Sequence, residues 1–117
     1  MAYEQRNLRR QKVRYNDDND DNKLEYQLVL DGAKVTPTSA TITIFRPGST
    51  TAVVTTASMT LSGSVLQYAP NTTTVANYPV DEGYRADLAI TYSGVVYRRQ
   101  LVFDVAKYLL DLNIGYD

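Results

Sequence analysis

Apolar and polar residues alternate along residues 84–93, which is the pattern of a β-strand with one buried face. The apolar positions are Tyr84, Ala86, Leu88, Ile90 and Tyr92. Ser93-Gly94 follows them, and glycine reaches positive φ without steric cost, so the pair predicts a tight turn. We therefore expect a β-hairpin in which residues 95–105 return antiparallel. Tyr84, Leu88 and Ile90 share parity and should be buried together.

Shorter segments upstream repeat the same alternation between turn signals. Residues 24–30 and 40–45 are the clearest, and Pro47 ends the second because proline removes a ladder donor. Weaker strands are expected over residues 51–56 and 65–68, with a possible short strand over 72–75. Six or seven short strands in about a hundred residues favour an all-β sandwich over a helical or βαβ fold.

Charge is distributed unevenly at the start of the chain, although the net charge is only −1. Residues 16–22 consist only of Asn and Asp, which favour solvated turns over helix or strand. This composition predicts a boundary near Asn22, with a flexible charged arm over 1–22, a sandwich over 23–105 and an apolar tail over 106–117. The arm carries five cations: Arg6, Arg9, Arg10, Lys12 and Arg14.

The tail contains large aliphatic residues that need cover. They are Leu109, Leu110, Leu112 and Ile114. A short helix that Gly115 could cap is indicated by the spacing i, i+3, i+4, i+7 and i+8 of Ala106, Leu109, Leu110, Asn113 and Ile114, and an extended tail is the alternative. They either close the bottom of the sandwich or dock on another chain.

The sequence lacks the residues of common catalytic and metal sites. Histidine and cysteine are absent, so hydrolytic, redox and thiolate-metal chemistries lack their usual parts, and we expect no catalytic, cofactor-binding or metal-binding residues. Asp81 and Glu82 are expected to shape a strand entrance. Counted from Asp17, the sixth and twelfth positions of a calcium loop would be Asn22 and Leu28 instead of Gly and Glu. The acidic tract is therefore interpreted as a solvated linker.

The basic residues favour a protein partner over nucleic acid. Only Tyr3 and Tyr15 could stack on bases near the arm, and the adjacent aspartates would repel a polyanion.

No apolar run approaches the about 20 residues that span a bilayer, and no signal-peptide core is visible. Arg98-Arg99 lies within a predicted strand, where it either protects a sheet edge or forms a salt bridge between subunits.

The closing hairpin resembles that of immunoglobulin-like domains, in which a Gly-Tyr step opens the penultimate strand. The residues that carry the resemblance are Gly83-Tyr84, Ser93-Gly94, Tyr97, Phe103 and Val105. Their order is similar to that of small Ig-like modules in structural proteins of tailed bacteriophages, and the resemblance covers residues 24–105. It implies an immunoglobulin-like antiparallel β-sandwich of about seven strands.

The resemblance also implies a role. A non-enzymatic structural subunit of a virion is expected, as a head–tail connector or neck, tail or decoration protein that assembles in the host cytoplasm. Its partners would be other virion proteins and copies of itself in a ring or lattice, bound through the arm cations and the tail aliphatics. The alternative is a carbohydrate-binding or adhesin-type module that uses Tyr68, Tyr78 and Tyr97. An enzyme subdomain is the third class.

Overall fold

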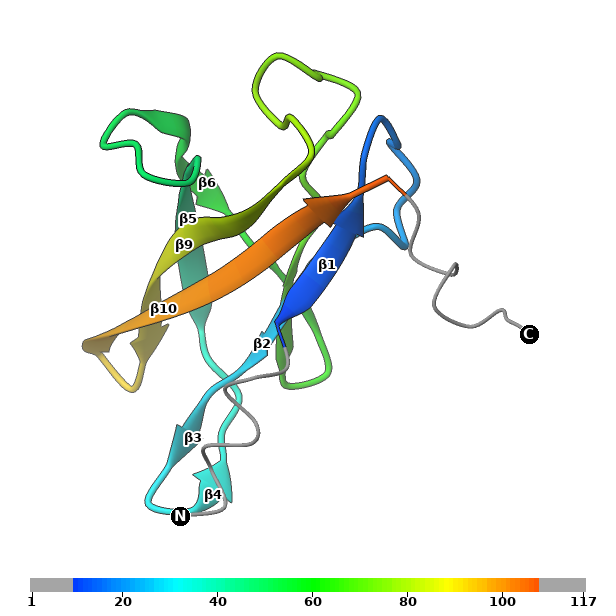
Figure 1. Cartoon of the computed structure of the whole chain (residues 1–117). Coiled ribbons are helices and arrows are strands. Elements are labelled where there is room, and N and C mark those ends of the chain that lie inside the picture. Colours follow the sequence, from blue (N-terminus) through cyan, green and yellow to red (C-terminus); the bar gives the residue numbers. More distant parts are fainter. Residues whose placement is uncertain (1–9, 108–117) are drawn as a thin grey trace.

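The computed structural model describes residues 10–107, and all of the regular structure in that range is β (Figure 1). This confirms the all-β prediction. The strands in chain order are β1 (Gln11–Arg14), β2 (Leu24–Gln27), β3 (Val29–Leu30), β4 (Ala33–Lys34), β5 (Ser39–Phe45), β6 (Ala52–Ser58), β7 (Thr60–Ser62), β8 (Val65–Tyr68), β9 (Asp81–Tyr92) and β10 (Val95–Ala106).

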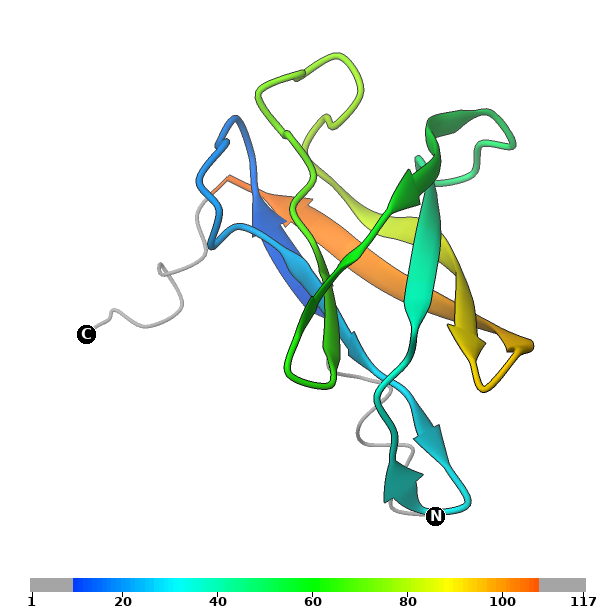
Figure 2. The same ribbon diagram turned by 180° about the vertical axis from the view of Figure 1, so that it is seen from behind.

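The strands form two layers and a small hairpin. The larger sheet has five strands in the order β1-β10-β9-β5-β6, and a three-stranded sheet in the order β2-β8-β7 packs on one of its faces, in front of it in the view of Figure 2. β3 and β4 pair only with each other. β1 runs parallel to β10, whereas all other neighbours are antiparallel. The β9–β10 hairpin is therefore the centre of the larger sheet.

The hydrophobic core lies between the two sheets and is filled by the alternating residues of the long strands. Tyr84, Leu88 and Ile90 are 0%, 2% and 0% exposed, which confirms their predicted burial. The ring of Tyr84 stacks on Phe103, with centroids 5.1 Å apart, and on Tyr78, at 6.1 Å. The smaller sheet contributes other fully buried side chains, including Leu24 and Leu66.

The turn between β9 and β10 has the predicted conformation. Ser93 and Gly94 both have positive φ, 52° and 77°. Two successive positive φ values are characteristic of a type I′ turn, whose twist matches that of the flanking strands. Residues 95–105 consequently return antiparallel, with Val95 opposite Tyr92.

The predicted domain boundary near Asn22 is wrong, because the folded unit begins earlier. β1 pairs with the end of β10, and Val13 is fully buried in the core. Asn22 itself is only 2% exposed. A four-residue strand among cations gives almost no local signal, and its partner lies about 90 residues away in the sequence. Residues 1–9 of the predicted arm lie outside the described residues.

The Asn/Asp tract forms a turn that is bonded to β1, so it is not a linker between an arm and the folded body, although most of its residues are exposed as predicted. Arg14 binds the carboxylates of Asp17 and Asp21 through contacts of 2.6 and 2.7 Å. The side-chain amide of Asn22 accepts from the main-chain N–H of Arg14 at 2.7 Å and donates to its carbonyl at 3.1 Å. These bonds satisfy the main-chain N–H and carbonyl of Arg14, which would otherwise need hydrogen bonds from water.

Two further segments differ from their predictions. Residues 24–30 do not form one strand, since the buried Leu28 separates β2 from β3. Residues 72–75 form turns instead of a strand, closed by main-chain bonds from the Thr74 N–H to the carbonyl of Asn71 at 3.2 Å and from the Asn77 N–H to the carbonyl of Thr74 at 2.9 Å. The hydroxyl of the buried Thr72 donates to the carbonyl oxygen of Arg14 at 2.6 Å. β10 ends at Ala106, and the tail residues Leu109, Leu110, Leu112 and Ile114 lie outside the described residues.

Candidate protein interface

β10 is paired along only one side for most of its length. It has 12 residues, and β9 accompanies it from Val95 to Val105. On the other side, β1 pairs only with the four residues from Phe103 to Ala106. Within the described part of the chain, residues 95–102 therefore have no strand partner on that side. We call this stretch the open edge.

Apolar side chains are exposed along the open edge. Val95 and Val96 at the hairpin tip are 50% and 51% exposed, and Val102 is 40% exposed. Tyr97 and Leu101 face the inner layer and are only half-buried, because the three-stranded sheet covers this end of the larger sheet incompletely. Exposed apolar groups beside unpaired main chain are typical of sites that accept another chain.

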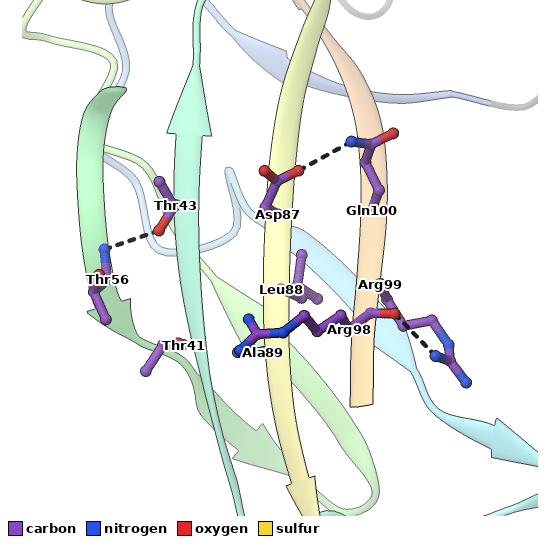
Figure 3. A pocket seen from close by; sticks show the side chains of 9 residues that line it. All are labelled: Thr41, Thr43, Thr56, Asp87, Leu88, Ala89, Arg98, Arg99 and Gln100. Atoms are coloured by element: carbon purple, nitrogen blue, oxygen red, sulfur yellow. Dashed lines mark hydrogen bonds between the residues drawn. The ribbon is translucent and has the colours of Figure 1, made fainter. Parts of the chain in front are cut away.

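The two arginines of the open edge point to opposite faces of the sheet, as neighbours on a strand must. Arg98 lies across β9 over Ala89, its partner in the ladder (Figure 3). Arg99 points the other way, with its guanidinium 5.7 Å from the ring centroid of Tyr97. Nη1 of Arg99 also donates to the carbonyl of Arg98 at 2.9 Å. The pair gives both faces of the edge a positive charge.

The outer face of the larger sheet is a shallow concavity with a volume of about 750 Å³ beside Arg98. Small side chains form its floor, among them Thr41, Thr43 and Ala89 (Figure 3). At one side Nε2 of Gln100 donates to Asp87 at 3.1 Å, and at the other the main-chain N–H of Thr56 donates to Oγ1 of Thr43, also at 3.1 Å. Some of the polar groups that line the concavity are thus already hydrogen-bonded within the chain.

Arg85, a charged residue next to this concavity, contacts two neighbouring side chains. The guanidinium of Arg85 lies 4.2 Å from the ring centroid of Phe45, and its Nε is 3.3 Å from Oδ1 of Asp87. Arg85 Nε makes no hydrogen bond within the described residues, because this contact with Asp87 is an ion pair without hydrogen-bond geometry. In contrast, the guanidinium of Arg98 makes no hydrogen bond or ion pair with any residue from 10 to 107.

Two of the predicted arm cations are used inside the chain. Nη1 of Arg10 binds Oδ1 of Asp104 at 2.9 Å, and the same carboxylate oxygen accepts from the N–H of Gly83 at 2.9 Å. Hydrogen bonds to Asp17 and Asp21 raise the pKa of Arg14, and the Arg14 guanidinium lowers the pKa of Asp17. Lys12 is exposed on β1. Arg6 and Arg9 lie outside the described residues.

The three tyrosines considered for carbohydrate binding do not form one surface. Tyr78 is 3% exposed and packs on Tyr84, and burial raises its pKa. Tyr68 lies in β8 and Tyr97 in β10, so they belong to different sheets. A groove lined by all three tyrosines is therefore not formed.

Residues 10–107 contain no group of three or more Asp, Glu, His or Cys placed to hold a metal ion. In that range, no helix is long and apolar enough to cross a membrane. Comparisons with family models, with curated protein sequences and with solved structures returned no match for this chain.

Sequence reasoning gave a sheet edge at Arg98-Arg99 only as one of two alternatives and did not predict the extent of the open edge. The turn signal at Ser93-Gly94 predicts a returning strand over residues 95–105, but not which neighbours that strand has. The arginine pair was the available signal, since charge within a strand is a common device at sheet edges.

Proposed function

We propose that the protein is a non-enzymatic structural subunit of a tailed-phage virion that acts through protein–protein contacts. The role would be that of a head–tail connector or neck, tail or decoration protein, located in the particle after assembly in the host cytoplasm. The fold proposed for it is an immunoglobulin-like sandwich.

The strand order supports the immunoglobulin-like assignment. In that fold the third, sixth and seventh strands share one sheet, and the second, fifth and fourth strands share the other. β5, β9 and β10 correspond to the first set, with β6 added beside β5, and β2, β8 and β7 correspond to the second. The short β1 adds to the edge of β10.

Tyr84 supplies a second feature of such sandwiches. It lies near the start of β9, and its hydroxyl donates to the carbonyl of Pro79, five residues upstream. A tyrosine at this corner that bonds back to the preceding main chain is a hallmark of immunoglobulin-like domains. Tyr84 belongs to the Gly83-Tyr84 step on which the resemblance to immunoglobulin-like domains is based, and its hydroxyl forms this bond.

The observation that carries the functional proposal is the open edge. A long hairpin, rigid through its paired β9 and β10, ends in exposed valines and an arginine without a partner in the described region. Arginine and tyrosine are the residue types enriched at protein interfaces, and the open edge carries Tyr97, Arg98 and Arg99 beside its exposed valines. In a subunit that assembles with other proteins, this end of the hairpin would form the contact surface.

Co-purification tests the proposal. Particles should be purified on a density gradient from cells that express the gene in its native context, and the protein quantified across the gradient by mass spectrometry. We expect the protein to peak with the major capsid protein and to stay bound after a high-salt wash. A protein found only in the soluble fractions would contradict the proposal. If specific binding on a glycan array accompanied that result, the adhesin alternative would replace it.

A further inference from the structure

We propose that the open edge of β10 accepts the C-terminal segment of a second copy, residues 108–117, as an added β-strand. The inference rests on the proposed function and deepens it, since it names the partner and the contact through which copies assemble. Strand addition to an exposed sheet edge is a recurring mode of recognition, in which main-chain hydrogen bonds supply affinity and alternate side chains supply specificity.

The length of the open edge suits a strand of this size. Of the 12 residues of β10, four pair with β1, which leaves eight without a partner on that side in the described structure. At about 3.3 Å per residue they extend roughly 26 Å. The segment 108–117 contains enough residues to cover this length when extended.

Three other edges in the described structure are protected, which favours this one. Both main-chain groups of Glu25 in β2 are bonded by the side chain of Gln11. β6 carries a bulge at which Thr56 has a φ of 52° and donates its N–H to Thr43. β7 has only three residues. Bulges, side-chain cover and short length are the usual protections of sheet edges.

The chemistry of the open edge defines what can bind there. Its inner side presents the half-buried Tyr97 and Leu101, with the Arg99 guanidinium 5.7 Å from the ring centroid of Tyr97, and its outer side presents Arg98. The partner strand should therefore be apolar on one face and acidic on the other. The chain's own residues before β1 fit poorly, because a strand that continued the β1 register would place Arg6 opposite Arg98. Like charges opposite each other destabilise a pair.

The C-terminal segment has the required pattern. From Leu110 onward apolar residues alternate with polar or small ones: Leu110, Leu112, Ile114 and Tyr116 alternate with Asp111, Asn113, Gly115 and Asp117, whereas Leu109 before them is out of step. This spacing is that of a strand with one apolar face. Between residues 108 and 117 there are two aspartates and no lysine or arginine, so the polar face complements Arg98.

The topology favours a segment from another copy over the chain's own. β10 ends at Ala106, and β1 occupies the edge from Phe103 to Ala106. β1 therefore stands between the end of β10 and the open edge of the same molecule (Figure 1). A tail that binds the next copy makes a heterologous, head-to-tail contact. Contacts of this type generate rings when the rotation closes and filaments when it does not.

A charge-swap experiment on the full chain tests the inference. Arg98→Glu and Asp111→Arg are made separately, and self-association is measured by sedimentation velocity over a concentration series at constant salt. Each variant alone should associate at least about tenfold more weakly than the wild type, since one close charge pair is worth that much or more. An equimolar mixture should recover the association, because each tail then meets an edge of opposite charge.

Lys34→Glu is the matched control, as it reverses an exposed cation on β4 away from the open edge. It should associate like the wild type. A second measurement uses Leu112→Ser, which should weaken association while the β-sheet signal in circular dichroism and the melting temperature remain unchanged. The inference is wrong if the wild type stays monomeric, if the mixture fails to recover association, or if Leu112→Ser unfolds the monomer.

The outcomes also separate this inference from the proposed function. A monomeric protein that is nonetheless found in purified particles would overturn the pairing between copies and leave the virion role standing. Association that follows the charge swap, in a protein absent from particles, would support the pairing and overturn the virion role.

Discussion

The side chain of Gln11 in β1 bonds to both main-chain groups of Glu25 in β2. Its Nε2 donates to the carbonyl oxygen at 2.6 Å, and its Oε1 accepts from the N–H at 2.8 Å. One amide thus acts as a short piece of strand and links the five-stranded sheet to the three-stranded sheet at one corner. The first strand consequently belongs to the sandwich, although the sequence around it reads as a charged arm.

Val13→Ala tests the place of β1 in the folded unit. Val13 is fully buried, so its truncation removes apolar contacts and leaves a cavity. We expect a loss of about 1 to 3 kcal/mol in the free energy of unfolding, measured by urea denaturation. Lys12→Ala on the exposed neighbour is the control and should stay within about 0.5 kcal/mol of the wild type. Equal stabilities for both variants would mean that β1 is dispensable.

Tyr84→Phe and Tyr78→Phe form a matched pair that differs in one hydrogen bond. The hydroxyl of Tyr84 donates to Pro79, whereas that of Tyr78 is buried without a partner among the described residues. Loss of the Tyr84 bond should cost about 1 kcal/mol, and removal of the unsatisfied Tyr78 hydroxyl should be neutral or stabilising. Chemical denaturation of the two variants in parallel measures the difference. The reverse order of stabilities would show that the corner bond is not a stabilising one.

Stability should fall steeply at alkaline pH. Burial raises the pKa of Tyr84 to about 12, with a further contribution from Asp81, and burial also raises the pKa of Tyr78. An unfolded tyrosine ionises near pH 10, so the folded state holds its protons more tightly than the unfolded state above that pH. The stabilisation is complete below pH 10 and is lost as pH rises toward 12. Melting temperatures across pH 8 to 12 should show this, and Tyr84→Phe should flatten the decline.

Ser93→Asn should stabilise the β9–β10 hairpin. Ser93 has a φ of 52°, a conformation that asparagine tolerates better than serine, and Asn-Gly is the preferred pair of a type I′ turn. We expect a gain of a few tenths to about 1 kcal/mol in thermal denaturation. Gly94→Ala at the neighbouring φ of 77° should instead destabilise. If Ser93→Asn lost stability, the turn would not be of type I′.

The predictions from sequence succeeded where the signal is local. The alternation of residues 40–45 and 84–92 gave β5 and β9 with alternating buried residues, and the Ser93-Gly94 turn gave the returning strand β10. It failed at β1, whose four residues are ordered by a parallel pairing with distant residues. It failed again at Asn22 and Thr72, whose polar side chains are buried because they bond to the main chain of the turn after β1.

The open edge could not be predicted for the same reason. Which side of β10 lacks a partner depends on where β1 ends, and no periodicity within residues 95–105 contains that information. The arginine pair indicated an edge or a contact between subunits, and the pairing shows that Arg98 and Arg99 do lie at an edge. The alternating pattern within residues 108–117 supports a pairing proposal only once the open edge is known.

The number of copies per particle tests the central claim most directly. Purified particles should be analysed by quantitative mass spectrometry with labelled peptides from residues 10–107, and the result normalised to the major capsid protein. A structural subunit of a ring or lattice should be present at a fixed copy number that matches a symmetry of the particle and is unchanged between preparations. Copy numbers near zero, or numbers that vary with the extent of washing, would contradict the claim.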